Sequence, residues 1–339
     1  MSQMLAEVQE APNRVRAALE ADAKIYADLG ERLRELNPSL VATVARGSSD
    51  HAATFATYLF PQCTGRVVAS IPPSVVTVLK SPLNLKDQFA LAISQGGGSP
   101  DIIQTVDCLR RSGALTAALV NSEKSELART AEILLRQHAG EEKSIAATKS
   151  VICTLTGIAR IAAAWSGDQS LQGGLNTLPG SLERAFETGM KADANMLAGI
   201  SNVYVLSRGL GLAAALEIAL KLKETCGVHA EAFSTAEVLH GPREIVDKKF
   251  LVIVLALPGS GQEDALAAAR ELKNQGAGVL LVAPAALGGA FVLPELTDNR
   301  LSPIVALELL YPWIARAAKA LGRDPDRPKT LTAKVIKTV

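Results

Sequence analysis

The two halves of this sequence repeat one another. Residues 41–50, VATVARGSSD, read as a buried strand that runs into an Arg-Gly turn, and residues 203–212, VYVLSRGLGL, show the same pattern 162 positions later. Two further pairs continue the repeat at nearly the same offset, namely 91–101 with 255–264 and 116–120 with 278–282. Such a duplication predicts two similar domains, each large enough to bury its own core.

The segments between these strands predict the fold class. Residues 101–113 and 263–277 carry apolar side chains at helical spacing, with glycine after the last turn. Because strands alternate with helices, we expect an α/β protein in which each half is a three-layer αβα sandwich with a central parallel sheet, flavodoxin-like or Rossmann-like. The expected parts are a helical arm (1–22), a first domain (23–180), a second domain (181–322) and a tail (323–339). The stretch 167–183 is rich in Gly, Pro and polar residues, so it is the expected linker between the two domains.

Composition excludes several classes of protein. Lys and Arg number 35 against 34 Asp and Glu, so no overall basic field favours nucleic acid or an anionic membrane. The four cysteines form no CxxC pair, which argues against structural zinc and suits reduced thiols. The first residues lack a signal-peptide core, and no 18-residue uncharged apolar run occurs. We therefore expect a cytoplasmic protein that is neither exported nor membrane-spanning.

Two serine-rich turns are candidates for anion binding. The loop 94–99, SQGGGS, follows a strand and opens a helix, so hydroxyls and backbone N–H groups converge at the positive end of that helix. This arrangement suits a phosphate, although a plain tight turn is the alternative. The loop lacks the lysine of a nucleotide-binding P-loop, and the turn 46–50 is not a dinucleotide fingerprint. Ser48 and Ser49, at the end of the neighbouring strand, add a second hydroxyl cluster.

The segment 215–242 holds the residues suited to acid and base chemistry. Glu217, Lys221 and Glu224 stand at i, i+4 and i+7, so on a helix they share one face. A solvated Glu–Lys surface pair is the alternative interpretation of this spacing. His240 precedes Gly-Pro, which places its imidazole on a turn. A carboxylate, an ammonium and an imidazole near one sugar could transfer protons next to a carbonyl.

Other polar residues have simpler interpretations. His51, His138 and His229 are expected to be packed, whereas Glu231 and Glu237 stay ambiguous. In 141–150, Ser144 or Thr148 is expected to cap the following helix. The sequence has no HExxH motif, nucleophile elbow or recognisable metal-ligand spacing, so we expect no metal and no organic cofactor.

Four segments carry a resemblance to a known family: ARGSSD, SQGGGSPD, SIAATKS and ALKLKETCGVHAEAFSTAEVLHGP. Together they resemble the isomerase half of glucosamine-6-phosphate synthase over nearly the whole chain, which implies two tandem sugar isomerase (SIS) domains. The resemblance implies that Glu224 moves a proton between C1 and C2 with the help of Lys221, and that Glu217 holds this set together. It also implies that His240 opens the sugar ring and comes from the neighbouring subunit of a homodimer with a shared active site.

The same resemblance assigns ligand contacts. The phosphate loop of the family corresponds to Ser94, Gln95, Gly96 and Ser99, and Ser48, Ser49 and the backbone near Ala146 and Ala147 surround the sugar. A lysine of the tail reaches the carbonyl end of the sugar, and it corresponds to Lys334 or, after a one-residue shift, Lys337.

Departures from the synthase shape the expected function. The chain begins Met-Ser-Gln, without the glutaminase domain whose first cysteine cuts glutamine, and Gly96, Ala147 and Arg46 replace Ser, Ser and Cys of the synthase. The chain thereby looks more like the SIS-type glucosamine-6-phosphate deaminases, which implies conversion of that sugar and water to fructose 6-phosphate and ammonia. The alternatives are a galactosamine-6-phosphate deaminase, a fructosamine-6-phosphate deglycase and a non-catalytic sugar-phosphate sensor. Two features argue against the sensor: no helix-turn-helix segment is fused to the chain, and the full acid/base set is present.

Overall fold

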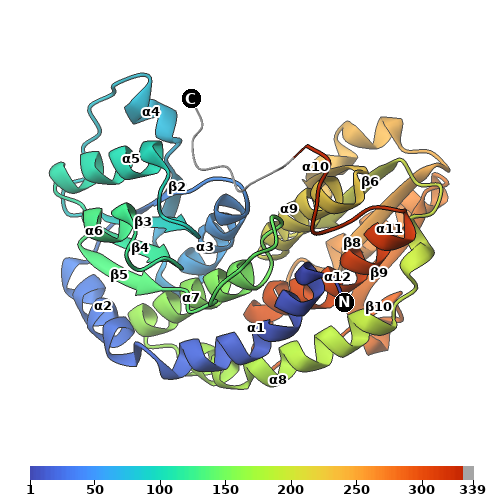
Figure 1. Cartoon of the computed structure of the whole chain (residues 1–339), viewed down its shortest axis with the longest axis horizontal. Coiled ribbons are helices and arrows are strands. Elements are labelled where there is room, and N and C mark those ends of the chain that lie inside the picture. Colours follow the sequence, from blue (N-terminus) through green and yellow to red (C-terminus); the bar gives the residue numbers. More distant parts are fainter. Residues whose placement is uncertain (331–339) are drawn as a thin grey trace. The chain divides into compact units, whose positions relative to one another are not determined.

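The computed structural model describes residues 1–330, which form two parallel five-stranded sheets (Figure 1). The first sheet has the order β2-β1-β3-β4-β5, with β1 at Leu40–Val44, β2 at Val67–Ser70, β3 at Phe89–Ser94, β4 at Leu115–Val120 and β5 at Ile133–Arg136. The second has the order β10-β9-β8-β6-β7, with β6 at Asn202–Ser207, β7 at His229–Ser234, β8 at Phe250–Leu255, β9 at Gly278–Pro284 and β10 at Phe291–Leu293. From its opposite edge, the second sheet has the order β7-β6-β8-β9-β10, which matches the first sheet strand for strand. The predicted repeat and the α/β fold class are therefore confirmed.

Helices connect the strands of both sheets. In the first half of the chain they are α1 (Gln3–Glu20), α2 (Ala23–Leu36), α3 (Ser48–Thr64), α4 (Pro73–Thr77), α5 (Pro100–Arg111), α6 (Glu126–Thr130), α7 (Lys149–Ser166) and α8 (Gln169–Lys191). In the second half they are α9 (Gly211–Lys221), α10 (Thr235–Leu239), α11 (Gln262–Asn274) and α12 (Ser302–Ala320), with a π-helical turn η2 (Leu222–Cys226) and the short 3-10 helices η1 (Ala194–Leu197), η3 (Pro242–Ile245), η4 (Ala285–Leu287) and η5 (Asn299–Leu301).

Each sheet is covered on both faces, which gives the expected three layers. Alternate residues of β1, β3 and β4 pack on α5 and α6 in one core cluster, while Phe60 of α3 and Trp165 of α7 stack edge-on near Phe89 on the opposite face. In the second sheet, one face of β6 and β8 packs on α10 and α11. α9 and α12 pack against each other, α9 packs on β6 and β7, and α12 packs on β10. Burial of β3, β4 and β8 along their whole length fits parallel strands with helices on both sides.

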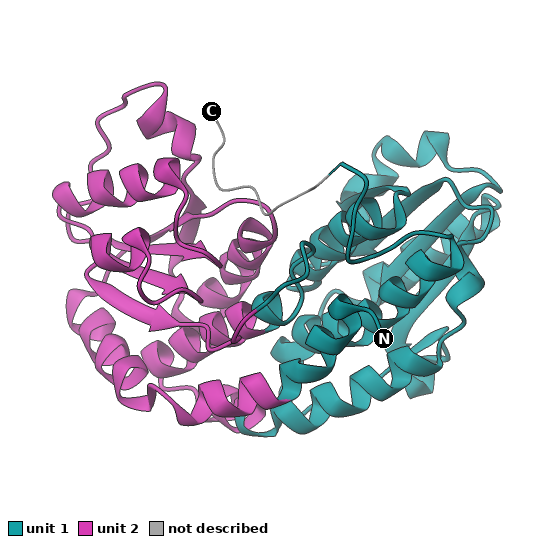
Figure 2. Cartoon of the chain, in the orientation of Figure 1, with its two compact units in different colours: residues 1–12, 142–152, 176–333 teal, residues 13–141, 153–175, 334–339 magenta. Residues whose placement is uncertain are grey.

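The chain divides into two compact units, shown in Figure 2. Of the described residues, unit 1 comprises 1–12, 142–152 and 176–330, and unit 2 comprises 13–141 and 153–175. Unit 1 therefore contains the second sheet together with the start of α1 and the loop before α7. The domain limits predicted from the sequence are continuous ranges, whereas each unit is made of several separate segments. The predicted limits stay a prediction.

The stretch 167–183, expected as a linker, is mostly helix. It lies almost wholly in α8, a helix that runs through Pro179 to Lys191. The reason is an apolar stripe at helical spacing, because Leu171, Leu175, Leu178, Leu182 and Ala185 are all fully buried. Tertiary burial of this stripe outweighs the weak helix propensity of the glycines.

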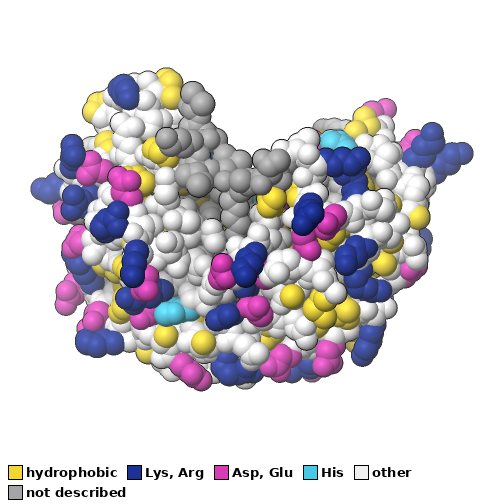
Figure 3. Space-filling model, viewed as in Figure 1, with side chains coloured by type: hydrophobic (Ala, Val, Ile, Leu, Met, Phe, Trp, Pro, Cys, Tyr) yellow, Lys and Arg dark blue, Asp and Glu magenta, His cyan; other side chains and the backbone are white. Residues whose placement is uncertain are grey.

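Charges are dispersed over the surface in view. In Figure 3, Lys and Arg side chains stand among Asp and Glu, without a broad patch of one sign. This agrees with the formal net charge of +1. Among residues 1–330, no helix has the length and apolar character needed to cross a membrane.

Candidate active site

The serine turns of the first half meet at the topological switch point of the first sheet. β1 and β3 are hydrogen-bonded neighbours, with Val44 beside Ala92, so the turns that follow them leave from the same edge. Ser48 and Ser49 form the first residues of α3, and Ser99 precedes α5 without using its hydroxyl as a cap. Ligands of open α/β sheets bind at such a point, where two helix N-termini converge.

The loop after β3 has a fixed backbone. The Ser94 hydroxyl accepts a hydrogen bond from the Gly97 N–H at 3.1 Å, and the Gln95 carbonyl accepts from two N–H groups of 121–122. Gly97 has a φ of +62° and lies so close to Ser125 that a Cβ there would stand 2.2 Å from the Ser125 hydroxyl. Beneath the loop, the Gln137 amide donates to the Ser94 carbonyl at 3.4 Å. The loop is thus held in one conformation before any ligand binds.

The predicted acid/base row forms on one helix face in unit 1. Glu217 and Lys221 belong to α9 and are fully buried, whereas the Glu224 side chain, in the π-helical turn, is 20% exposed. Lys221 Nζ lies 3.4 Å from Glu217 Oε1 and forms a short ion pair with Glu224. Burial rules out the alternative of a solvated surface pair. A π turn in place of the next α turn is a feature found frequently at functional sites.

Electrostatics keep Lys221 charged. Burial by itself disfavours the ammonium, but the carboxylates of Glu217 and Glu224 outweigh it and raise the pKa of Lys221 above its ordinary value. Behind Glu217, the Tyr311 hydroxyl of α12 donates to Oε1 at 3.4 Å. Burial, followed by nearby carboxylates, raises the pKa of Tyr311 well above its ordinary range, so the phenol stays a donor. The row is therefore a fixed array with one carboxylate, Glu224, at its accessible end.

His240 lies where the sequence predicts it. It directly follows α10 as its C-cap residue and precedes Gly241, and its side chain is exposed. The Tyr204 hydroxyl of β6 donates to the Pro242 carbonyl at 3.0 Å, which anchors the turn from below. The imidazole is thus displayed on a supported turn rather than packed inside unit 1.

The loop before α7 is held by two buried carboxylates. Glu142 accepts the N–H groups of Thr148 and Ser150 at 3.0 and 3.1 Å, and Glu7 of α1 accepts the Ser144 N–H at 3.1 Å. The expected capping by Ser144 or Thr148 is wrong, because Glu142 takes the helix amides and neither hydroxyl has a partner in the structure. Ala146, buried, and Ala147, half-buried, lie on this loop in unit 1.

The other histidines differ from expectation. His229 is exposed rather than packed, since it begins the edge strand β7, and its Nδ1 lies 3.1 Å from Asn202 Oδ1. His51 and His138 are only partly buried, and His138 Nε2 lies 2.7 Å from Asp22 Oδ2.

Four further residues named in the sequence analysis are two glutamates and two lysines of the tail. Glu231 and Glu237 are exposed. Lys334 and Lys337 lie outside the described residues.

Two supporting residues had no signal in the sequence. Tyr311 lies within an apolar helix, is fully buried, and donates to Glu217, which is 94 positions earlier. Gln137 lies more than forty positions after Ser94, whose carbonyl it contacts. Contacts between residues so far apart in the sequence leave no spacing pattern, so only the structure could identify these two.

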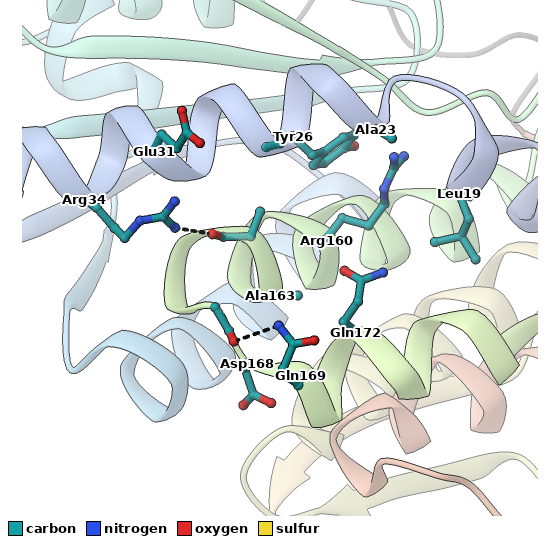
Figure 4. A pocket seen from close by; sticks show the side chains of 13 residues that line it. Leu19, Ala23, Tyr26, Glu31, Arg34, Arg160, Ala163, Asp168, Gln169 and Gln172 are labelled. Atoms are coloured by element: carbon teal, nitrogen blue, oxygen red, sulfur yellow. Dashed lines mark hydrogen bonds between the residues drawn. The ribbon is translucent and has the colours of Figure 1, made fainter.

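One further pocket of the described residues is lined by neither the serine turns nor the acid/base row. Within residues 1–330, no cluster of three or more His, Cys, Asp or Glu residues is suited to a metal ion. A pocket of about 410 Å³ lies among α1, α2, α7 and α8 in unit 2 (Figure 4). Three of its charged side chains bind backbone groups near helix ends. Arg34 donates to the Trp165 carbonyl, Arg160 donates to the Ala21 carbonyl, and Asp168 accepts a hydrogen bond from the Leu171 N–H.

Comparison with known proteins reveals clear relatives. The SIS domain family matches residues 38–164 and 196–287. The glutamine-fructose-6-phosphate aminotransferase (isomerizing) of Methanothermobacter thermautotrophicus is 32% identical over 97% of this chain, and that of Thermococcus kodakarensis is 28% identical over 98%. The chain spans only 56% and 57% of the length of these two proteins.

Solved structures with the same fold include one from Silicibacter pomeroyi, provisionally named a phosphosugar isomerase. It is 35% identical, with a TM-score of 0.89 over 96% of this chain and 100% of that chain. A glucosamine-6-phosphate deaminase from Thermotoga maritima is 24% identical, with a TM-score of 0.80 over 99% of this chain and 100% of that chain, a likeness that concerns the fold alone.

Proposed function

This chain belongs to the SIS domain family, and from that premise we propose that it is a glucosamine-6-phosphate deaminase. The observation that carries the proposal is the buried row Glu217, Lys221 and Glu224, which ends in one accessible carboxylate. The relatives named as aminotransferases of fructose 6-phosphate, which is the sugar product of the proposed reaction, support a sugar phosphate as the substrate.

Phosphate binding is the first proposed step. The hydroxyls of Ser48, Ser49, Ser94 and Ser99, with the Gln95 side chain and the backbone at Gly96, bind the 6-phosphate at two helix N-termini. Donors already fixed by the Ser94–Gly97 hydrogen bond lose little freedom when the ligand arrives.

Proton transfer is the second step. His240 protonates the ring oxygen and opens the sugar, and Glu224 then takes the proton from C2 and returns it to C1, which converts the aldehyde-amine into a ketose imine. Lys221 holds the Glu224 carboxylate in position. Water adds to the imine carbon, and the C–N bond breaks to release fructose 6-phosphate and ammonia. All protons in these steps pass between side chains, substrate and water, so the proposed reaction balances without an oxidant, a metal or an organic cofactor.

Ammonia release tests the proposal directly. Purified protein is given glucosamine 6-phosphate, with galactosamine 6-phosphate, the N-acetylated sugar and a fructosamine 6-phosphate in parallel. Ammonia and fructose 6-phosphate from the first sugar support the proposal. Ammonia from the galactosamine sugar alone, or glucose 6-phosphate and an amine from the fructosamine, would replace it by the corresponding deaminase or deglycase, and no turnover of any sugar would leave a sensor.

A conservative substitution tests the role of Glu224. In Glu224→Gln the side chain keeps its size but can no longer accept the C2 proton, so we expect kcat to fall by about 10³-fold or more while substrate affinity stays within a few-fold. Lys223→Gln, a change at the exposed neighbour in the same turn, serves as the control and keeps full activity. Substantial turnover by Glu224→Gln would remove this residue from the proposed role.

A further inference from the structure

Arg46 connects the two serine turns of unit 2. It lies two residues before Ser48, and its guanidinium forms a close ion pair with Asp101, which lies two residues after Ser99 in the first turn of α5. The Asp101 side chain is only 11% exposed, whereas that of Arg46 is 44% exposed. A largely buried carboxylate thus holds a partly exposed cation at the switch point of the first sheet.

The second half of the chain repeats this pair. Arg208 follows β6 as Arg46 follows β1, and its Nε lies 3.5 Å from Asp264 in the first turn of α11. Because both halves have this ion pair, its shared role is structural: it joins the end of one strand to the start of the helix that follows the neighbouring strand. Any further role of Arg46 must therefore come from what differs between the two places.

The surroundings of the two arginines differ in the groups that could bind an anion. The turn after Arg46 carries Ser48 and Ser49, whereas Leu210 and Gly211 stand at the corresponding positions after Arg208. Arg208 also donates to the Ser234 hydroxyl at 3.0 Å, so it has two partners of its own. Ser48 and Ser49 thus have no hydroxyl counterparts in the turn that follows Arg208.

Charge and space at the serine turns favour a contact between Arg46 and a phosphate. Arg46 is the only cationic residue in 46–50 and 94–99. A Cβ placed on Gly96 would meet no atom within 4 Å, so an oxygen can approach the loop backbone there. Hydroxyls and amides are neutral donors, and a dianion removed from water binds far better with a charged partner.

We propose that Arg46 binds the phosphate of the ligand, with its guanidinium oriented by Asp101. The planar fork of an arginine can share its N–H donors between a carboxylate and a phosphate, which a lysine cannot do with the same geometry. This inference rests on the proposed phosphate role of the serine turns but not on the deamination step.

Calorimetric binding separates the two roles of the pair. Inorganic phosphate and fructose 6-phosphate are titrated into the full chain, with fructose as the uncharged comparison, for wild type, Arg46→Met, Arg46→Lys and the matched control Arg208→Met. We expect Arg46→Met to raise Kd for both phosphate probes about 10- to 100-fold, the loss typical of a charge-assisted hydrogen bond. Arg46→Lys should bind more tightly than Arg46→Met, and Arg208→Met should stay within about twofold of wild type.

The salt dependence gives a second readout that a purely structural role would not change. Without the positive charge of Arg46, the Kd of Arg46→Met should depend less steeply on ionic strength than that of the wild type. Arg208→Met should keep the wild-type slope. Equal Kd values for wild type and Arg46→Met, equal weakening in Arg208→Met, or no phosphate binding by the wild type would each overturn the proposal. Because these titrations involve no turnover, their failure is distinguishable from a failure to release ammonia.

Discussion

Single residues decide what kind of chemistry this fold can perform, and Lys221 is the clearest case. The spacing of Glu217, Lys221 and Glu224 is equally compatible with a solvated surface and with an active site. Burial separates these possibilities, because an ammonium without solvent needs carboxylates around it, and here it has two. The sequence therefore predicted the row but could not predict its burial, which depends on α12 packing against α9.

Glu308 offers a test of stability at the same scale. Its carboxyl group is fully buried without a hydrogen-bond partner, and burial raises its pKa well above the ordinary value. The folded protein thus keeps the proton that the unfolded chain loses above its ordinary carboxyl pKa, so wild-type stability falls as pH rises beyond that value. We expect Glu308→Met, which conserves volume, to raise the free energy of unfolding by about 1–3 kcal/mol at pH 8.

The pH dependence distinguishes this mechanism from simple repacking. Since both folded and unfolded wild type carry the proton at low pH, the gain from Glu308→Met should shrink toward pH 4. Urea unfolding of both proteins at several pH values measures the difference. A gain of the same size at every pH would show that Glu308 is not the titrating group.

At the scale of elements, strands and their turns were more predictable than helices and linkers. The repeated strand ends at 41–50 and 203–212 are local patterns, and the structure forms both sheets around them. The Gly-rich and Pro-containing stretch in α8 forms a helix instead of a linker because its buried leucines find partners far along the chain. His229 shows the same limit, since an edge position is a property of the sheet and not of the local sequence.

Two neighbouring glycines test how the phosphate loop is built. Gly97 has a φ of +62° and no room for a Cβ, so Gly97→Ala forces a left-handed alanine and displaces the Ser125 hydroxyl that accepts the Ala128 N–H. We expect a loss of about 1–3 kcal/mol in unfolding free energy. Gly96→Ala, with open space and no positive φ, is the matched control and should change stability by less than about 0.5 kcal/mol. Thermal unfolding compares the two, and equal losses would contradict this description of the loop.

At the scale of the whole molecule, duplication lets two similar sheets take different tasks. Both halves keep the strand order and the Arg–Asp pair at the switch point, but the first half carries the serine turns and the second carries the acid/base row. In the proposed function, the first half binds the anion and the second half transfers the proton. The second Gly-rich turn, at Gly259 and Gly261, keeps one serine, Ser260, where the first has Ser94 and Ser99.

Complementation between inactive variants tests whether a second subunit takes part. We propose a homodimer in which His240 serves the active site of its neighbour, and its exposed position on an anchored turn supports this role. Glu224→Gln and His240→Asn are each expected to be inactive. In a heterodimer of the two variants, one of the two sites would carry both defects and the other would carry neither.

Random exchange of subunits in an equal mixture makes half of the dimers mixed, so about a quarter of wild-type activity should return. Glu224→Gln mixed with Lys221→Met is the control, because both residues belong to one helix of one subunit and every site then keeps a defect. Recovery is measured as ammonia release after partial denaturation and refolding of the mixture. If the Glu224 and His240 variants stay inactive together while refolded wild type regains activity, each subunit must supply its own histidine.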